Sequence, residues 1–178
     1  MRRIILAAVG VAALAAGAIA VAGPPGSGTT AVSGTFTATT VTKLTTRTCT
    51  GPDGSYQFTD AQYAGTATST DSHLSGPVTI HAHTVYNTTK NLGTVRGDLR
   101  IDTTGPGQTK AKLVAVDSSG TLSGSVSGHA GPDTSLMGTL SGSLNPATGF
   151  ASGSIGTGAS GAVLSNPKPC PAKPPKKH

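Results

Sequence analysis

The sequence predicts an all-β protein: an antiparallel meander of about eight strands that forms a closed or nearly closed barrel. Apolar and polar residues alternate with a period of two over much of the chain. Short segments rich in Gly, Pro, Asn and Asp interrupt this alternation. Thr, Ser, Gly and Ala dominate the sequence, a composition that favours strands and turns over long helices. A β-sandwich is the alternative, because it uses the same alternation.

The alternation is most regular between Leu74 and Leu144. The segments 74–78, 122–126 and 140–144 each begin with Leu-Ser-Gly and end with Val or Leu. Successive strand side chains point to opposite faces of a sheet. The pattern therefore places Leu, Val and Gly on a buried face, and Ser, Thr and charged residues on an exposed one.

The first three expected strands cover residues 32–48, 62–69 and 74–86. In the first strand, the inward phase of apolar residues and Gly fails near Thr40 and Val41, which predicts a β-bulge. Pro52-Asp53-Gly54 has the composition of a turn and separates the first strand from the second. In the third strand, apolar residues share a single phase.

The fourth expected strand, residues 94–102, has the clearest pattern, because its odd positions are apolar or Gly and most of its even positions are charged. Four more strands are expected after it, separated by short segments rich in turn residues. Such short connections require antiparallel neighbours and hence a meander. The later strands are expected at 109–116, 121–130, 136–144 and 150–156.

Glycine recurs at inward positions of these strands, where it weakens a strand interior. In one interpretation, these glycines permit the sharp bending that closes a small barrel. In the other, they leave room for a small apolar ligand, since an eight-stranded barrel is either just filled or holds one small molecule. The bending interpretation is the favoured one. The candidate lumen-lining residues are Val78, Ile80, Gly97, Leu99, Gly124, Val126, Gly138, Leu140 and Gly142.

The N-terminal residues 1–22 have the pattern of a signal peptide: two arginines, an uncharged apolar stretch, and Ala20-Val21-Ala22 as a cleavage site. Cleavage there would give a secreted protein without a membrane span. An uncleaved anchor through residues 4–22 is the alternative, because about 20 apolar residues can span a bilayer. We expect a flexible linker at 23–31, the barrel domain at 32–166, and a disordered Pro/Lys-rich tail at 167–178.

The net charge of +6 comes from the two ends of the chain. Between them, seven Lys and Arg residues balance seven Asp residues, and the sequence contains no Trp. A body without a basic face or stacking aromatics argues against nucleic-acid binding. The basic tail could contact an anionic cell-surface polymer, although a solvated terminus is the more common role of such a run.

The two cysteines, Cys49 and Cys170, are expected to form a disulfide, because the export signal implies an oxidising environment. Two free thiols, or pairing between chains, are the alternatives. In a barrel whose first and last strands are neighbours, the last strand would end near Val32, far from Cys49. Residues 157–169 would then run back along the barrel, with 162–164 as a candidate extra strand.

Residues suited to catalysis are sparse, so the sequence assigns no catalytic, cofactor or metal residues. His81 and His83 share one strand face and form a candidate metal pair. That face is the outer one, and no third ligand lies nearby in sequence, so a solvated pair is favoured. The glycines of segment 156–161 match a dinucleotide-binding spacing, but no helix is expected after them.

Three short motifs carry a family resemblance: the segment 46–56, the segment 63–69 and Leu74-Ser-Gly. Their pattern resembles small, uncharacterised exported β-rich proteins of high-GC Gram-positive bacteria. The resemblance implies a secreted bacterial protein and supplies no catalytic residues.

Three functions follow as hypotheses. The favoured one is a non-enzymatic barrel that binds a small apolar ligand or a surface partner. The second is a cell-wall-associated structural or interaction protein tethered by its basic tail. The third is a barrel isomerase or cyclase, which would need ionisable residues inside the lumen, where the strand phases place few of them.

Overall fold

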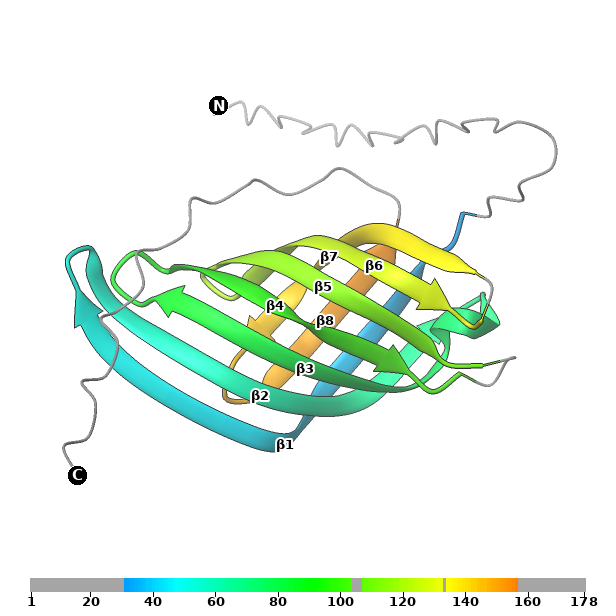
Figure 1. The fold of residues 1–178 in the computed structure, drawn as a ribbon, viewed down its shortest axis with the longest axis horizontal. Coiled ribbons are helices and arrows are strands. Elements are labelled where there is room, and N and C mark those ends of the chain that lie inside the picture. Colours follow the sequence, from blue (N-terminus) through cyan, green and yellow to red (C-terminus); the bar gives the residue numbers. More distant parts are fainter. Residues whose placement is uncertain (1–30, 104–106, 133, 157–178) are drawn as a thin grey trace, which may run out of the picture. The chain divides into compact units, whose positions relative to one another are not determined.

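The computed structural model describes residues 31–103, 107–132 and 134–156, and their strands form one closed barrel (Figure 1). Eight strands follow one another around the barrel in chain order, and every neighbouring pair is antiparallel. The predicted all-β meander barrel is thus confirmed, and the sandwich alternative is excluded. The expected signal peptide, the tail and Cys170 lie outside the described residues, as does all but the last residue of the linker.

The observed elements match most of the expected strands within two or three residues. One differs more, because β2 begins at Gly54 rather than Gln62. The start of β3 differs by two residues, and Leu74 belongs to a short 3-10 turn instead of opening this strand. The segment 54–61 lacks regular alternation, but it pairs with strands on both sides. The elements are β1 (Gly34–Gly51), β2 (Gly54–Ser69), η1 (Ser72–Leu74), β3 (Gly76–Asn87), β4 (Leu92–Ile101), β5 (Thr109–Ser118), β6 (Thr121–Ala130), β7 (Ser135–Asn145) and β8 (Gly149–Gly156).

The barrel closes where β1 pairs with β8, with Gly34 opposite Ile155 and Phe36 opposite Gly153. A circuit of paired residues that leaves β2 at Thr59 passes through all eight strands and returns to β2 at Ser69. This stagger requires the strands to tilt against the barrel axis.

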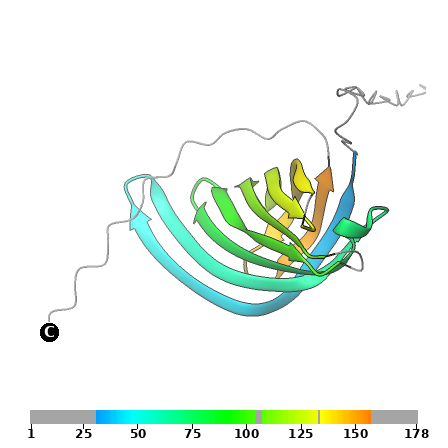
Figure 2. The same cartoon turned by 45° about the vertical axis from the view of Figure 1, so that its right-hand side comes forward.

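Strand β1 has two parts: its first residues, 34–38, pair with both β8 and β2, and the remainder pairs with β2. Its register with β2 shifts between Thr37 and Thr40 and again between Val41 and Lys43, which confirms the predicted bulge. Beyond these shifts, β1 continues past the end of its pairing with β8 and pairs only with β2, which stays paired with β3 as far as Tyr56 (Figure 2). Leu44 lies on this extension and is 45% exposed, although its phase faces inward.

The core fills the inside of the barrel with apolar side chains, as the alternation predicts. Three aromatic rings meet there: Phe150 lies 5.8 Å from Phe36 and 5.5 Å from Tyr63, edge-on to the latter. Leu74 in η1 is 2% exposed and packs with this core, and the Thr109 hydroxyl donates to the carbonyl oxygen of His73 next to it. Among the described residues, no helix has the length and apolar character needed to cross a membrane.

Candidate functional site: a hydroxyl-lined groove

The nine candidate lumen-lining residues all lie on the inward phase of β3, β4, β6 and β7. Their Val, Ile and Leu side chains belong to the core and are at most 2% exposed. A Cβ atom on Gly97, Gly124 or Gly142 would lie only 2.1 to 2.3 Å from a backbone oxygen of a neighbouring strand. Neighbouring backbone therefore occupies the space of the absent side chains, which favours the bending interpretation of these glycines.

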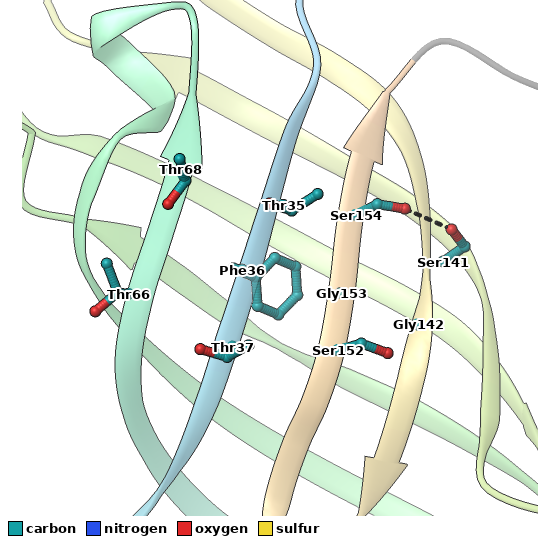
Figure 3. Close-up of a pocket in the computed structure, with 10 residues that line it drawn as sticks. All are labelled: Thr35, Phe36, Thr37, Thr66, Thr68, Ser141, Gly142, Ser152, Gly153 and Ser154. Atoms are coloured by element: carbon teal, nitrogen blue, oxygen red, sulfur yellow. Dashed lines mark hydrogen bonds between the residues drawn. The ribbon is translucent and has the colours of Figure 1, made fainter.

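Two hollows formed by the described residues lie on the outside of the barrel. The first has a volume of about 440 Å³ and crosses four adjacent strands, in the order β2, β1, β8 and β7 (Figure 3). Seven of its ten lining residues carry a hydroxyl group, and none carries a charge. We call it the hydroxyl groove; it is lined by Thr35, Phe36, Thr37, Thr66, Thr68, Ser141, Gly142, Ser152, Gly153 and Ser154.

The hydroxyl side chains of the groove form a row across the strands. Thr68 on β2 is paired with Thr35 on β1, Thr35 with Ser154 on β8, and Ser154 with Ser141 on β7. Ser123 on β6 is paired with Ser141 and continues the row. Directly opposed residues on one face have Cβ atoms about 5 Å apart, so neighbouring hydroxyls can bind the same ligand.

The local sequence explains why these hydroxyls face solvent. Each strand here alternates Thr or Ser with an inward Phe, Ala or Gly, as in Thr35-Phe36-Thr37 and Ser152-Gly153-Ser154. The floor of the groove contains Phe36, which is 3% exposed and whose ring lies toward Gly153 (Figure 3). The alternation thus separates an apolar floor from polar walls.

The hydrogen bonds of the groove differ between its two sides. On the β7–β8 side, the Ser141 and Ser154 hydroxyls lie 2.7 Å apart, and those of Ser143 and Ser152 3.1 Å apart. On the β1–β2 side, the hydroxyls of Thr35, Thr37, Thr66 and Thr68 make no hydrogen bond within the described part of the chain. A hydroxyl donates one hydrogen bond and accepts two, so this side suits a neutral polar ligand.

A second hollow, of about 610 Å³, adjoins the hydroxyl groove and shares Thr35, Thr68 and Ser154 with it. Its other lining residues include Ser33, Ser69, Thr70 and Thr139, and none is charged. The Ser69 hydroxyl donates to the Ser33 carbonyl oxygen at 2.5 Å and links β2 to the residue before β1. The two hollows together form a continuous uncharged surface that carries hydroxyl groups along the β1–β8 junction.

The predicted histidine pair lies on the outer face of β3, where the alternation places it. Asp60 on β2 contacts both rings: its Oδ1 lies 3.2 Å from His81 Nε2 and its Oδ2 lies 2.7 Å from His83 Nδ1. The hydrogen bond with His81 holds the pKa of Asp60 below its ordinary value, and positive charge on His83 and Lys43 acts in the same direction. Sequence reasoning missed Asp60 because it precedes the expected start of the second strand.

Cys49 is half-buried near the end of β1, and its expected disulfide partner Cys170 lies outside the described residues.

Comparison with known protein families, with curated proteins and with solved structures finds no match for this chain.

Proposed function

We propose that this protein is a non-enzymatic binding module whose hydroxyl groove binds an extended, uncharged polyhydroxyl chain, such as a glycan strand at a cell surface. One observation carries the proposal: an uninterrupted row of Ser and Thr hydroxyls runs across adjacent strands with no charged residue in the groove. Sugar hydroxyls both donate and accept hydrogen bonds, so such a row matches them in kind.

The same surface argues for an extended partner over a small apolar one. The inward face of the barrel is occupied by the packed core, whereas the groove carries hydroxyl groups and is open to solvent. The adjoining hollow extends the hydroxyl surface beyond a single sugar unit. No ionisable group lines the groove, so it lacks the acid and base that group transfer or isomerisation requires.

Export to the cell surface belongs to the proposal and rests on the sequence alone. Residues 1–22 would direct secretion, and the lysines of the tail 167–178 would add a weak attraction to anionic wall polymers. In this arrangement, the groove selects a neutral glycan chain, and the positively charged tail adds attraction to anionic wall polymers. Retention at the wall by the tail is the second candidate function, favoured by the clustering of four lysines there.

Co-sedimentation with insoluble glycans tests the groove. The full chain is incubated with purified cell-wall glycan, chitin or cellulose, and bound protein is measured against concentration. We expect saturable binding to at least one glycan, weakened at least tenfold by the triple change Thr35→Val, Thr68→Val and Ser154→Ala. Each lost hydrogen bond is expected to cost about 1 kcal/mol.

The matched control removes exposed hydroxyls from another part of the outer face, with Ser125→Ala and Ser127→Ala on β6. This double variant should bind as tightly as the unchanged chain. Absence of binding to every glycan, or equal weakening in both variants, would overturn the proposed function. Deletion of residues 167–178 separates the tail's contribution, because it should abolish only the salt-sensitive part of wall binding.

A further inference from the structure

A second polar cluster lies on the outer face of β2 and β3, and it shares no residue with the hydroxyl groove. Asp60 on β2 is paired directly with His83 on β3, and His81 lies two residues from His83 on the same face. The ring centroids of the two histidines are 4.6 Å apart. One ligand atom from each of the three residues lies within 4.8 Å of the others.

The three side chains belong to a recurrent class of metal ligands. Two imidazoles and one carboxylate occur at open metal sites, where the remaining positions hold water or a substrate. Around a tetrahedral zinc ion with bonds of about 2.1 Å, neighbouring ligand atoms lie about 3.4 Å apart. Asp60 Oδ2 lies 2.7 Å from His83 Nδ1 and Asp60 Oδ1 lies 3.2 Å from His81 Nε2, and one ligand atom from each of the three residues lies within 4.8 Å of the others. Modest side-chain rotations therefore bring three ligand atoms to the separation that the ion requires.

The cluster is also accessible to an ion from solvent. The side chains of Asp60, His81 and His83 are 35%, 41% and 56% exposed, so binding needs no opening of the barrel. Strands β2 and β3 hold all three residues in a continuous antiparallel register, which limits the entropy lost when the ion binds.

The charges around the cluster are mixed. Lys43 Nζ lies 3.9 Å from Asp60 Oδ1, and Arg96 is paired with His83 across β3 and β4. Asp98 is paired with His81 on the other side and is engaged by Lys112. The positive charges of Lys43 and Arg96 reduce the attraction of the cluster for a divalent ion, and the negative charge of Asp98 partly offsets this reduction. We therefore expect a site of moderate affinity.

We propose that Asp60, His81 and His83 bind a zinc ion on the outer face of the barrel, with a fourth coordination position open to solvent. Each imidazole presents one unprotonated nitrogen to the ion, and Asp60 presents one carboxylate oxygen. The hydrogen bonds that join Asp60 to the two rings are then replaced by bonds to the metal. The open position allows the ion to link the barrel to a ligand atom of another molecule.

Isothermal titration of the full chain with zinc chloride, after treatment with a chelator, tests this site. We expect binding of a zinc ion with an affinity that falls at least tenfold in each of Asp60→Asn, His81→Ala and His83→Ala, because each change removes one of three ligands. Zinc should also raise the melting temperature of the unchanged chain, since it binds only the folded arrangement. The three variants should lose this rise.

Two control variants keep the test specific to the cluster. His129→Ala removes an exposed histidine from β6, and Asp98→Asn removes the neighbouring carboxylate that is not among the three ligands. Both should bind zinc within about threefold of the unchanged chain, a difference below 1 kcal/mol. Binding that is absent in the unchanged chain, or weakened equally by His129→Ala, would overturn the proposal. Because the substituted residues are partly or fully exposed on the outer face, circular dichroism should show the same fold for all five variants.

Discussion

Gly153 on β8 lies directly against the ring of Phe36 on β1, and a Cβ atom on this glycine would come within 2.1 Å of a ring atom. The two residues are paired at the seam where the first and last strands close the barrel. The ring therefore occupies the place of the missing side chain and packs 5.8 Å from Phe150. This contact joins the closure of the barrel to the floor of the hydroxyl groove.

Gly153→Ala should destabilise the barrel by about 1–3 kcal/mol, because the added methyl group overpacks a filled core. Urea denaturation measures the loss. Gly156→Ala, near the end of the same strand, is the control, since its Cβ would meet only Ser33 at 3.9 Å. Adding Phe36→Leu to Gly153→Ala should recover part of the stability; a double variant less stable than both single variants would contradict the packing argument.

Thr59 and Thr84 are paired across β2 and β3 inside the barrel, and neither buried hydroxyl has a hydrogen-bond partner in the part of the chain that the structure describes. Thr59→Val and Thr84→Val replace each hydroxyl with a methyl group of similar size and should each stabilise the fold by about 1 kcal/mol. Thr109→Val should instead destabilise it by about the same amount, because the Thr109 hydroxyl donates to the His73 carbonyl oxygen at 2.6 Å. Thermal melts of the three variants measure these changes in stability. Destabilisation by all three would show that the Thr59 and Thr84 hydroxyls do have hydrogen-bond partners.

Asp117 is 1% exposed at the end of β5, and burial raises its pKa above the ordinary value of 3.8, despite a hydrogen bond from the Gly120 amide. The folded state thus holds the proton of Asp117 more tightly than the unfolded state does. Its contribution to stability is greatest below pH 3.8 and declines as the pH rises through the folded pKa.

Asp117→Asn removes this penalty and retains an oxygen that can accept from Gly120. The variant should therefore be more stable than the unchanged chain at pH 7, and this advantage should disappear at pH 3. Comparing the two proteins at each pH cancels the opposite trend of Asp60, Asp71 and Asp102, whose pKa values are lowered. An advantage that is independent of pH would show that the effect does not arise from ionisation.

The expected disulfide between Cys49 and Cys170 can be tested by alkylation. Under denaturing conditions the chain, produced in an oxidising compartment, should take up no alkylating reagent before reduction and two groups after it, as measured by mass spectrometry. Removing the disulfide should lower the free energy of unfolding by about 2–4 kcal/mol. The loss should be the same in Cys49→Ser, Cys170→Ser and the double variant, because all three remove the same bond. Uptake of two groups without reduction would contradict the prediction.

Much of the barrel could be predicted because strand patterning is local. The alternation of 94–102 appears in β4, and the segment 121–130 is found unchanged as β6. The failed phase at Thr40 and Val41 indicated the bulges in β1. The first half of β2 was missed because the segment 54–61 is stabilised by hydrogen bonds to β1 and β3, and these partners leave no periodic signal in its own residues.

In the two candidate sites, the sequence predicts some features and the tertiary structure decides the others. The sequence by itself determined that Thr35, His81 and His83 face outward, because side-chain direction in a strand depends only on the period of two. The outward direction of Ser154 depends on the irregularity between β7 and β8, which lets both Phe150 and Ile155 point inward. The tertiary structure alone decided which of these residues meet. Closure of β1 against β8 places Thr35 beside Ser154 from the other end of the domain, and the register of β2 with β3 places Asp60 beside His83. Register is a relation between strands, set by turns, bulges and barrel closure together, so no single segment encodes it.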